Sequence, residues 1–193
     1  MSFSCTDKLL RVKLDEAVRV LTGGGVAVIP TDTVYGLAAH PDFPDAVARL
    51  YSIKARDERK PIALLAADAQ AAARFLGREL PARAADLAAR FWPGALTLVL
   101  PVADGSRFEG IRVPDHAWTR ALLARCGGVL RVTSANMSGR RPATDAPAAL
   151  AEVGLAADLV VDGGMSPGGE ASTVAKVLAD GTVEILRQGG VSL

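Results

Sequence analysis

The sequence predicts an α/β protein with a mixed sheet and flanking helices, folded as a single domain over residues 1–193. Three observations predict it. Short apolar runs bounded by glycine or proline alternate with amphipathic segments, which is typical of strands alternating with helices. Asp180-Gly181 between two β-prone runs indicates an antiparallel hairpin, so the sheet is mixed and not purely parallel. The length is that of one domain, roughly 100–200 residues, and no repeat or linker interrupts it.

The first half is expected to alternate helix and strand. In order, we expect a helix around residues 14–21 ending at Gly23-Gly24-Gly25, a strand at 26–29, a polar loop at 31–41, a helix around 47–54, a strand at 62–66, a helix around 84–91 and a strand at 96–100. The run Val26–Ile29 is continuously apolar, as in a strand buried on both faces. Apolar residues recur at i, i+3, i+4 and i+7 from Ala84 to Phe91, the stripe of an amphipathic helix.

The second half repeats the alternation. We expect a strand near residues 111–113, a helix around 118–125, a strand at 129–132, a loop at 133–142, a strand at 159–161 and hairpin strands at 173–178 and 183–186.

Composition and charge limit the classes of function that the protein can have. The net charge is +1, from 22 basic and 21 acidic residues. A dedicated nucleic-acid binder usually carries a strong basic excess, so any RNA contact must come from a local patch. The start of the chain lacks the pattern of a signal peptide, and no run approaches ~18 apolar residues, so we expect no membrane segment and a cytoplasmic protein.

No protein-bound metal is predicted. Cys5 and Cys126 are isolated, and only His40 and His116 could join them as ligands. Gly164 to Gly168 matches the Gly-x-Ser-x-Gly turn of α/β-hydrolases, but that site needs a histidine later in the chain, and none follows His116. We therefore interpret Ser166 as part of a flexible glycine-rich loop.

Two polar segments of the first half are candidates for chemistry. In Pro30-Thr-Asp-Thr-Val-Tyr-Gly-Leu37, two hydroxyls flank a carboxylate, which fits a ligand site or a capped turn. Residues 54–60 carry four cations in seven positions, which suits a polyphosphate or, alternatively, a solvated charge run.

The second half adds three more candidates. Thr133 to Gly139 offers hydroxyls and an amide directly after a strand, either for phosphates or the waters of a magnesium ion, or as a plain turn. Arg112 lies between two apolar residues, where an arginine either faces solvent or binds an anion such as a ligand carboxylate. Arg187 ends the hairpin. Because ligands of open α/β sheets bind at the carboxyl ends of strands, we expect these loops to converge.

Taken together, these segments resemble the YrdC/TsaC family. The matching pieces are Pro30-Thr-Asp-Thr-Val-Tyr-Gly-Leu37, Lys54-x-Arg56 with Lys60-Pro61, Trp92-Pro-Gly94 with Thr97, Ile111-Arg-Val113, Ser134-Ala-Asn136-x-Ser-Gly139, Ser172-Thr173 and Arg187-Gln-Gly189. They occur in the family's order and cover roughly residues 14 to 190.

The resemblance implies an α/β fold with an open, twisted mixed sheet and flanking helices, a YrdC-like single domain that is a threonylcarbamoyl-AMP synthase. Its substrates would be ATP, L-threonine and bicarbonate, with Mg²⁺ accompanying ATP. Threonine and bicarbonate would form a carbamate whose oxygen attacks the α-phosphate and expels pyrophosphate. A partner transferase would then use the adenylate to modify the adenosine beside the anticodon of certain tRNAs.

The resemblance also implies residue roles. Thr33, Arg112 and Ser172 look like threonine contacts, with Arg112 on the carboxylate. The nucleotide would be bound by Arg56, Lys60, Ser134, Asn136 and Arg187, and the catalytic pair would be Lys54 and Arg56. The family often has glycine where this chain has Ala55, and proline where it has Ala95.

Some alternatives stay open. A non-catalytic RNA-binding module on the same fold, or a weak tRNA contact beside the enzyme activity, would use the cations of residues 54–60 and Arg140-Arg141. A hydrogenase-maturation enzyme with a similar domain would be longer and richer in cysteine. The identity of a general base, for which Asp32 is a candidate, the oligomeric state and the cover of the active site are not determined by the sequence.

Overall fold

The computed structural model describes the backbone of residues 5–193 and the side chains from residue 13 onward. The N-terminal segment in which we looked for a signal peptide, and the side chain of Cys5, lie outside the described residues. The helices are α1 (Cys5–Thr22), α2 (Pro44–Lys54), α3 (Ala69–Leu76), α4 (Ala82–Phe91), α5 (Ala117–Arg125) and α6 (Ala146–Glu152), with a short 3₁₀ helix at Gly154–Ala156. The strands are β1 (Val26–Ile29), β2 (Gly36–Ala39), β3 (Leu64–Ala66), β4 (Leu96–Pro101), β5 (Phe108–Arg112), β6 (Val129–Ser134), β7 (Leu159–Val160), β8 (Thr173–Val177) and β9 (Val183–Arg187).

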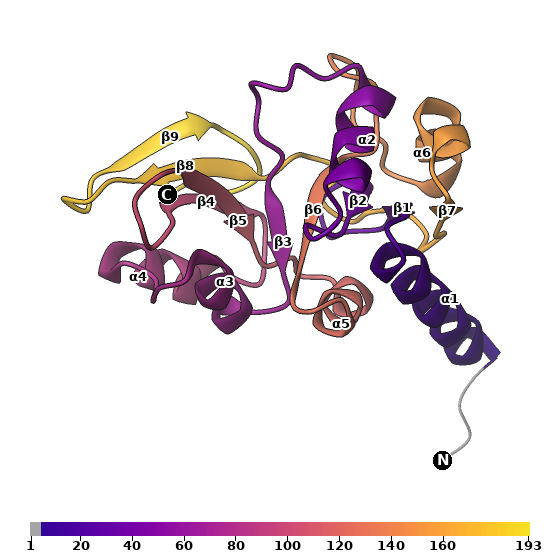
Figure 1. Ribbon diagram of the computed structural model, residues 1–193, viewed down its shortest axis with the longest axis horizontal. Coiled ribbons are helices and arrows are strands. Elements are labelled where there is room, and N and C mark those ends of the chain that lie inside the picture. The colour runs from indigo at the N-terminus through magenta and orange to yellow at the C-terminus, as the bar shows by residue number, and fades with distance from the viewer. Residues whose placement is uncertain (1–4) are drawn as a thin grey trace.

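The strands within residues 5–193 form one nine-stranded sheet in the order β7-β1-β2-β6-β3-β5-β4-β8-β9. The pairs β1–β7, β3–β5 and β4–β8 are parallel, and the other pairs are antiparallel. The predicted mixed sheet is therefore confirmed, and β8 and β9 form the predicted terminal hairpin (Figure 1).

Helices cover both faces of the half of the sheet built on β1 and β2. Val26 and Val28 face the core cluster that includes α2 and α6, whereas Ala27 and Ile29 face the cluster that includes α1 and α5. Since side chains alternate along a strand, a strand covered on both sides must be apolar throughout. This is why Val26–Ile29 is a continuous apolar run.

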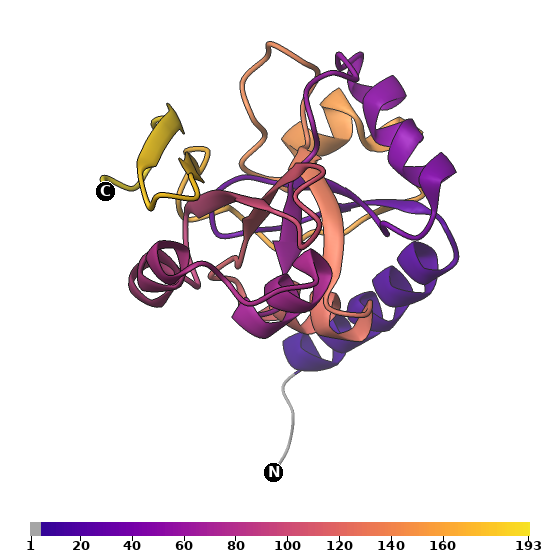
Figure 2. The same cartoon turned by 60° about the vertical axis from the view of Figure 1, so that its left-hand side comes forward.

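The other half of the sheet is packed differently. Helices α3 and α4 lie against one face of β3, β4 and β5 (Figures 1 and 2), where the core includes Leu96, Leu98 and Ile111. Alternation then directs Thr97 and Arg112 to the opposite face. The polar residues singled out in the sequence lie along that face.

Some elements differ from the sequence prediction. Residues 36–39, predicted as part of a loop, form β2, and β6 extends two residues into the predicted loop at 133–142. Helices α3 and α6 were not predicted. Both are short and alanine-rich, so few large apolar residues mark them in the sequence, although Asp68 and Asp145 cap them by accepting from Ala71 N and Ala148 N.

Candidate functional site

Arg112 organises the first cluster of the candidate site. The residue is only 6 % exposed, and its Nη1 donates to Asp32 Oδ1 at 2.7 Å and to the Gly94 carbonyl at 3.4 Å. Its Nη2 donates to Thr33 Oγ1 at 3.1 Å. An arginine has five N–H donors, so two have no partner among the described residues, enough for one bidentate contact with a carboxylate.

A chain of hydroxyls fixes Thr33. Thr31 Oγ1 donates its proton to the Val34 carbonyl at 2.7 Å and accepts from Thr33 N at 3.1 Å. The two hydroxyl oxygens are 3.0 Å apart, and because the Thr31 proton is already used, Thr33 is the donor between them. Thr33 Oγ1 is therefore oriented with its lone pairs toward Arg112.

A second cluster lies where β8 begins and β9 ends. Arg187 donates from Nε and Nη2 to the Ser172 carbonyl at 3.1 and 2.7 Å, and from Nη2 to Ser172 Oγ at 3.2 Å. Ser172 Oγ lies 2.8 Å from Thr97 Oγ1 on the neighbouring strand. Arg187 thus holds the hydroxyl of Ser172 in one place.

Lys54 forms a third cluster at the end of α2. Its ammonium is buried, with 2 % of the residue exposed, and donates to the carbonyls of Ser134 and Asn136 and to Asn136 Oδ1 at 3.4 Å. The amide of Asn136 donates to the carbonyls of Met137 and Arg140 at 2.9 and 2.7 Å. Lys54 therefore ties the loop after β6 to the end of α2.

Burial lowers the pKa of Lys54. Removal of the ammonium from water is the largest cause, the charge of Arg56 adds to it, and Glu152 opposes it, so the pKa falls from 10.5 to about 8. The three oxygens around Nζ hydrogen-bond the charged form and use all its donors. A direct catalytic contact of Lys54 with a substrate, as the sequence suggested, would require one of these bonds to break.

Electrostatic interaction joins the clusters into a series of cations. Burial of the Arg187 guanidinium against Ser172 lowers its pKa, and the charges of Arg112 and Arg56 lower it further. Arg56 likewise lowers the pKa of Lys54. Arg56 itself donates from Nε to the Lys60 carbonyl at 3.0 Å and from Nη2 to the Pro61 carbonyl at 3.3 Å. Such a series repels itself and favours a polyanionic ligand.

The structure brings most of the predicted residues together, though not in the way expected. Strand β3 is parallel to β5 and antiparallel to β6, so the carboxyl ends of β5 and β6 do not share an edge. Side chains that extend from different strands connect the loops instead. Lys60 is exposed and Ser134 is half-buried, and among the described residues neither side chain has a hydrogen-bond partner.

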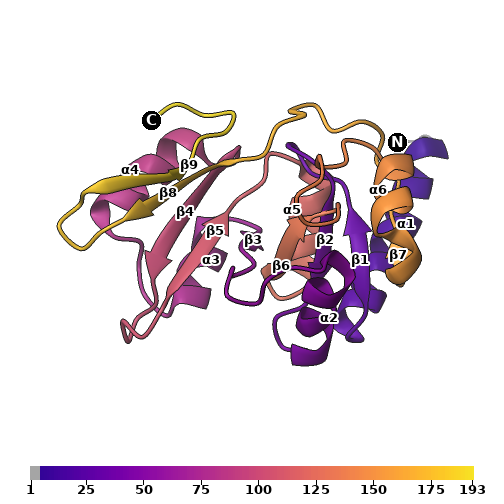
Figure 3. The same cartoon turned by 90° about the horizontal axis from the view of Figure 1, so that it is seen from above.

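The segment between β7 and β8, residues 161–172, crosses the molecule from one half of the sheet to the other (Figure 3). Tyr35 Oη donates to the Gly164 carbonyl at 2.6 Å, and Gly168 N donates to the Asp32 carbonyl at 2.9 Å. A Cβ at Gly168 would lie 2.7 Å from the Asp32 carbonyl oxygen and 3.2 Å from Thr33 Cα. This segment is packed on the Thr33 loop, whereas the sequence indicated only a flexible loop.

Sequence reasoning missed one supporting residue, Glu152, which accepts from Met137 N at 3.1 Å and so holds the loop after β6. Thr31 and Tyr35 lie in the predicted segment from Pro30 to Leu37, but no separate role was predicted for them. Glu152 lies in α6, which the sequence analysis did not predict. Asp32 carried a signal, a carboxylate between two hydroxyls, but its partner Arg112 is 80 residues away.

No metal centre is evident within the described part of the chain. Among those residues there is no group of three or more histidine, cysteine, aspartate or glutamate side chains that could hold an ion. No helix among them is long and apolar enough to cross a membrane.

Comparison with known proteins identifies the family. The Sua5/YciO/YrdC family model, described as "Telomere recombination", matches residues 19–189, and the chain belongs to this family. It is 35 % identical over 189 residues to a Bacillus subtilis protein and 38 % identical over 159 residues to a Halorhodospira halophila protein, both named threonylcarbamoyl-AMP synthase. These matches cover 93 % and 78 % of this chain and 54 % and 83 % of those proteins.

Solved structures agree with the family assignment. The crystal structure of Pyrococcus abyssi Sua5 complexed with L-threonine matches with a TM-score of 0.85 and 32 % identity, over 93 % of this chain and 54 % of that chain. Escherichia coli YciO matches with a TM-score of 0.80 and 26 % identity, over 93 % and 90 %. The chain thus spans about half the length of the Bacillus and Pyrococcus relatives.

The backbone conformation of Ala55 explains why the family often has glycine at this position, and it leads to a prediction. It ends α2 with φ 47°, in the left-handed region where a non-glycine residue costs roughly 1–2 kcal/mol. Glycine relieves this strain but loses more chain entropy on folding, by roughly 0.5–1 kcal/mol. We expect Ala55→Gly to stabilise the protein by about 0.5–1 kcal/mol in denaturant unfolding. Gly139→Ala, at φ 85°, should have the opposite sign, and a destabilised Ala55→Gly variant would contradict the explanation.

The buried ammonium of Lys54 yields a pH-dependent prediction. Its pKa is lower in the folded state, about 8, than the ordinary 10.5, so between these values the unfolded chain binds more protons and stability rises with pH. We expect the stability of the wild type relative to Lys54→Met to increase from about pH 8 to about pH 10, with a slope of up to ~1.4 kcal/mol per pH unit. Denaturant unfolding of both proteins across this range measures it, and a constant or falling difference would show that the ammonium is not penalised by burial.

Proposed function

We propose that the protein is a threonylcarbamoyl-AMP synthase, which forms threonylcarbamoyl-adenylate and pyrophosphate from L-threonine, bicarbonate and ATP. The proposal rests on one observation. A buried arginine, Arg112, lies close enough to other cations, among them Arg56 and Arg187, to interact with them electrostatically. Arg112 suits an amino-acid carboxylate and the other cations suit a polyphosphate. The relatives named for this activity, and the relative crystallised with L-threonine, support it.

The threonine side of the site is proposed to be built on Arg112, Thr33 and Ser172. The two free N–H donors of Arg112 would bind the carboxylate, while Thr33 and Ser172 would contact the rest of the amino acid. Asp32 Oδ1 already accepts from Arg112, which leaves Oδ2 to accept from the threonine nitrogen. Asp32 is accordingly our candidate to take the proton released when that nitrogen forms the carbamate.

The nucleotide side is proposed to use Arg56, Lys60, Ser134, Asn136 and Arg187. As a carbamate oxygen attacks the α-phosphorus, the bond to the pyrophosphate oxygen breaks and charge moves onto the leaving group. Fixed cations stabilise this charge without reorganising, which is the largest contribution the protein can make to phosphoryl transfer. Lys54 would hold Asn136 and the loop after β6 in position and would not contact the substrate.

Magnesium is proposed to arrive with ATP, because Mg²⁺ is usually held by substrate phosphates together with few protein ligands. The product would pass to a tRNA-modifying transferase, so we place the reaction in the cytoplasm. Any tRNA contact by this chain itself would be weak, given a net charge of +1.

The activity itself is the first prediction of this proposal. Purified protein with ATP, magnesium, bicarbonate and L-threonine should release pyrophosphate, and omission of either threonine or bicarbonate should abolish the release. Folded protein that releases none, yet binds tRNA tightly at moderate salt without threonine, would instead be an RNA-binding module. Release that does not depend on threonine would contradict the proposed substrate.

Arg112→Ala tests the threonine contact. Loss of a charged hydrogen bond to the carboxylate should weaken threonine use by about 1.5–3 kcal/mol, measured as kcat/KM for threonine. ATP binding should change little. Because the change also leaves Asp32 without its partner, unfolding curves should confirm that the variant is folded, and Arg90→Ala on α4 serves as the control. An equal loss for both substrates would mean that Arg112 does not belong to the threonine side.

A further inference from the structure

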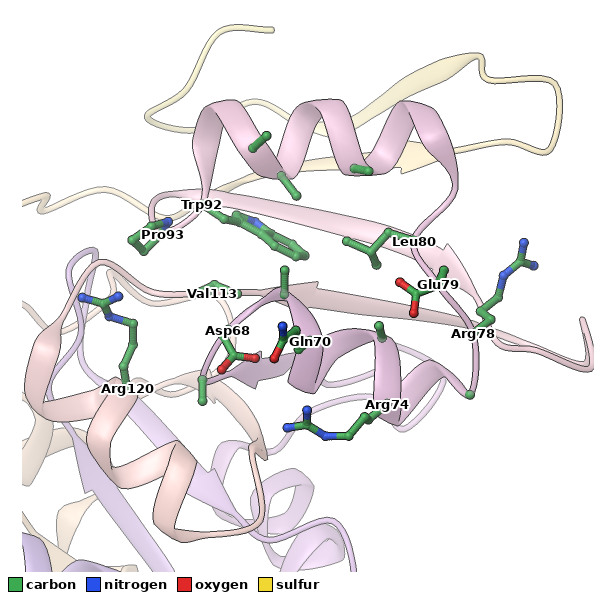
Figure 4. Close-up of a pocket in the computed structure, with 17 residues that line it drawn as sticks. Asp68, Gln70, Arg74, Arg78, Glu79, Leu80, Trp92, Pro93, Val113 and Arg120 are labelled. Atoms are coloured by element: carbon green, nitrogen blue, oxygen red, sulfur yellow. The ribbon is translucent and has the colours of Figure 1, made fainter.

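A groove lies on the face of the sheet opposite to the cation series. It has a volume of about 940 Å³ and runs between α3 and α4 (Figure 4). Alanines form both walls, and the partly buried side chains of Leu80 and Trp92 lie between them. The wall alanines are Ala69 and Ala73 from α3 and Ala85, Ala88 and Ala89 from α4.

Arg120 of α5 lies at one end of this groove, where its side chain extends toward Pro93 (Figure 4). Its Nε is one of two buried side-chain nitrogen or oxygen atoms without a hydrogen-bond partner among the described residues, the other being Ser166 Oγ. A buried donor of a charged group that finds no acceptor is costly. The Nη groups of Arg120 also have no hydrogen-bond partner among the described residues, and an anion in the groove would meet the guanidinium there and offset its charge.

The remaining charges of the groove limit what such a ligand can be. Arg74 and Arg78 also line it, together with Asp68 and Glu79, and Asp68 Oδ1 already accepts from Ala71 N in capping α3. The two carboxylates offset the charges of these two arginines, so Arg120 is left as the net positive charge of the lining. A ligand that carries many negative charges, such as RNA, a nucleoside triphosphate or an acidic helix, is therefore not favoured, whereas one anionic group at the Arg120 end is.

We propose that the groove binds an anionic amphiphile, a small molecule with one carboxylate, sulfonate or phosphate group and a flat apolar body. The anionic group would accept from Arg120, and the body would lie on Trp92 between the alanine walls. The volume is near the upper end of the roughly 300–1,000 Å³ usual for small-molecule sites, which are mostly apolar with a few placed polar groups.

The groove is connected to the proposed threonine side through one short segment. Val113 lines the groove, while the preceding residue, Arg112, points to the opposite face. Pro93 also lines the groove, and the next residue, Gly94, accepts from Arg112 Nη1 and donates to the Val113 carbonyl at 2.8 Å. An occupant of the groove would thus rest against the backbone that holds Arg112.

Binding of anilinonaphthalene sulfonate, which has one sulfonate on a flat aromatic body, tests the proposal by fluorescence titration of the full chain. We expect saturable binding that Arg120→Gln weakens about tenfold or more, as loss of a charged hydrogen bond should. Ala89→Leu, which fills the groove from α4, should weaken binding at least as much. The matched controls are Arg83→Gln and Ala82→Leu on the same helix, both outside the lining, and these should bind like the wild type.

Three results would each overturn the proposal. The first is no saturable binding to the folded wild type, and the second is binding that both groove variants leave unchanged. The third is displacement of the dye by ATP, which would place the dye in the nucleotide site. Thermal unfolding of each variant shows that it is folded, and Ala89→Leu tests the groove independently if Arg120→Gln is not. The result is independent of pyrophosphate release, so failure here leaves the proposed activity intact.

Discussion

The structure depends on holding several cations close together without matching carboxylates. Arg112 has Asp32, but Arg187 and Lys54 are held by the oxygens of Ser172, Ser134 and Asn136, and Arg56 by two backbone carbonyls. Carbonyl oxygens orient a cation and leave its charge uncompensated, while burial and the charges of neighbouring arginines lower the pKa of Lys54 and of Arg187. A polyanion bound as proposed would stabilise the protein, because attraction to the ligand would then replace repulsion between the cations. Under the proposed function, the repulsion in the unliganded protein is the cost of a preorganised anion site.

The two halves of the sheet divide the task of building this site. Strands β1 and β2, covered by helices on both faces, form a rigid apolar layer from which the Thr31–Val34 turn extends. Strands β4, β5 and β8 contribute Leu96, Ile111 and Ala175 to the core on the side of α3 and α4. Their intervening residues are thus available on the other side for polar contacts. Residues 161–172 then return from β7 to β8 over the Thr33 loop, so both halves contact the same site.

The sequence was sufficient for most of this architecture, whereas the roles of the site residues stay predictions. Elements with strong periodicity or continuous apolar runs, such as Val26–Ile29 and Ala84–Phe91, lie where expected. Strand β2 was missed because Gly36–Ala39 is short and directly follows the polar Thr31–Val34 turn. Pairwise geometry could not be predicted, because the side-chain partners of Arg112 and the carbonyls that accept from Lys54 are 79–82 residues distant in the chain. The order of the motifs predicted which residues belong to the candidate site, whereas the mixed strand directions determine which of their side chains are in contact.

The pair of Asp32 and Arg112 shows why a ligand carboxylate need not break the ion pair to bind. Both side chains are largely buried, at 10 % and 7 % exposed, so separation would leave two uncompensated charges at considerable cost. Asp32, however, meets only Nη1, and Thr33 takes one donor of Nη2. The remaining N–H groups can donate to a carboxylate while Asp32 keeps the guanidinium plane fixed. The nitrogen of an amino acid bound there would lie close to the same aspartate. A single ion pair would then orient both the carboxylate and the nitrogen of the amino acid.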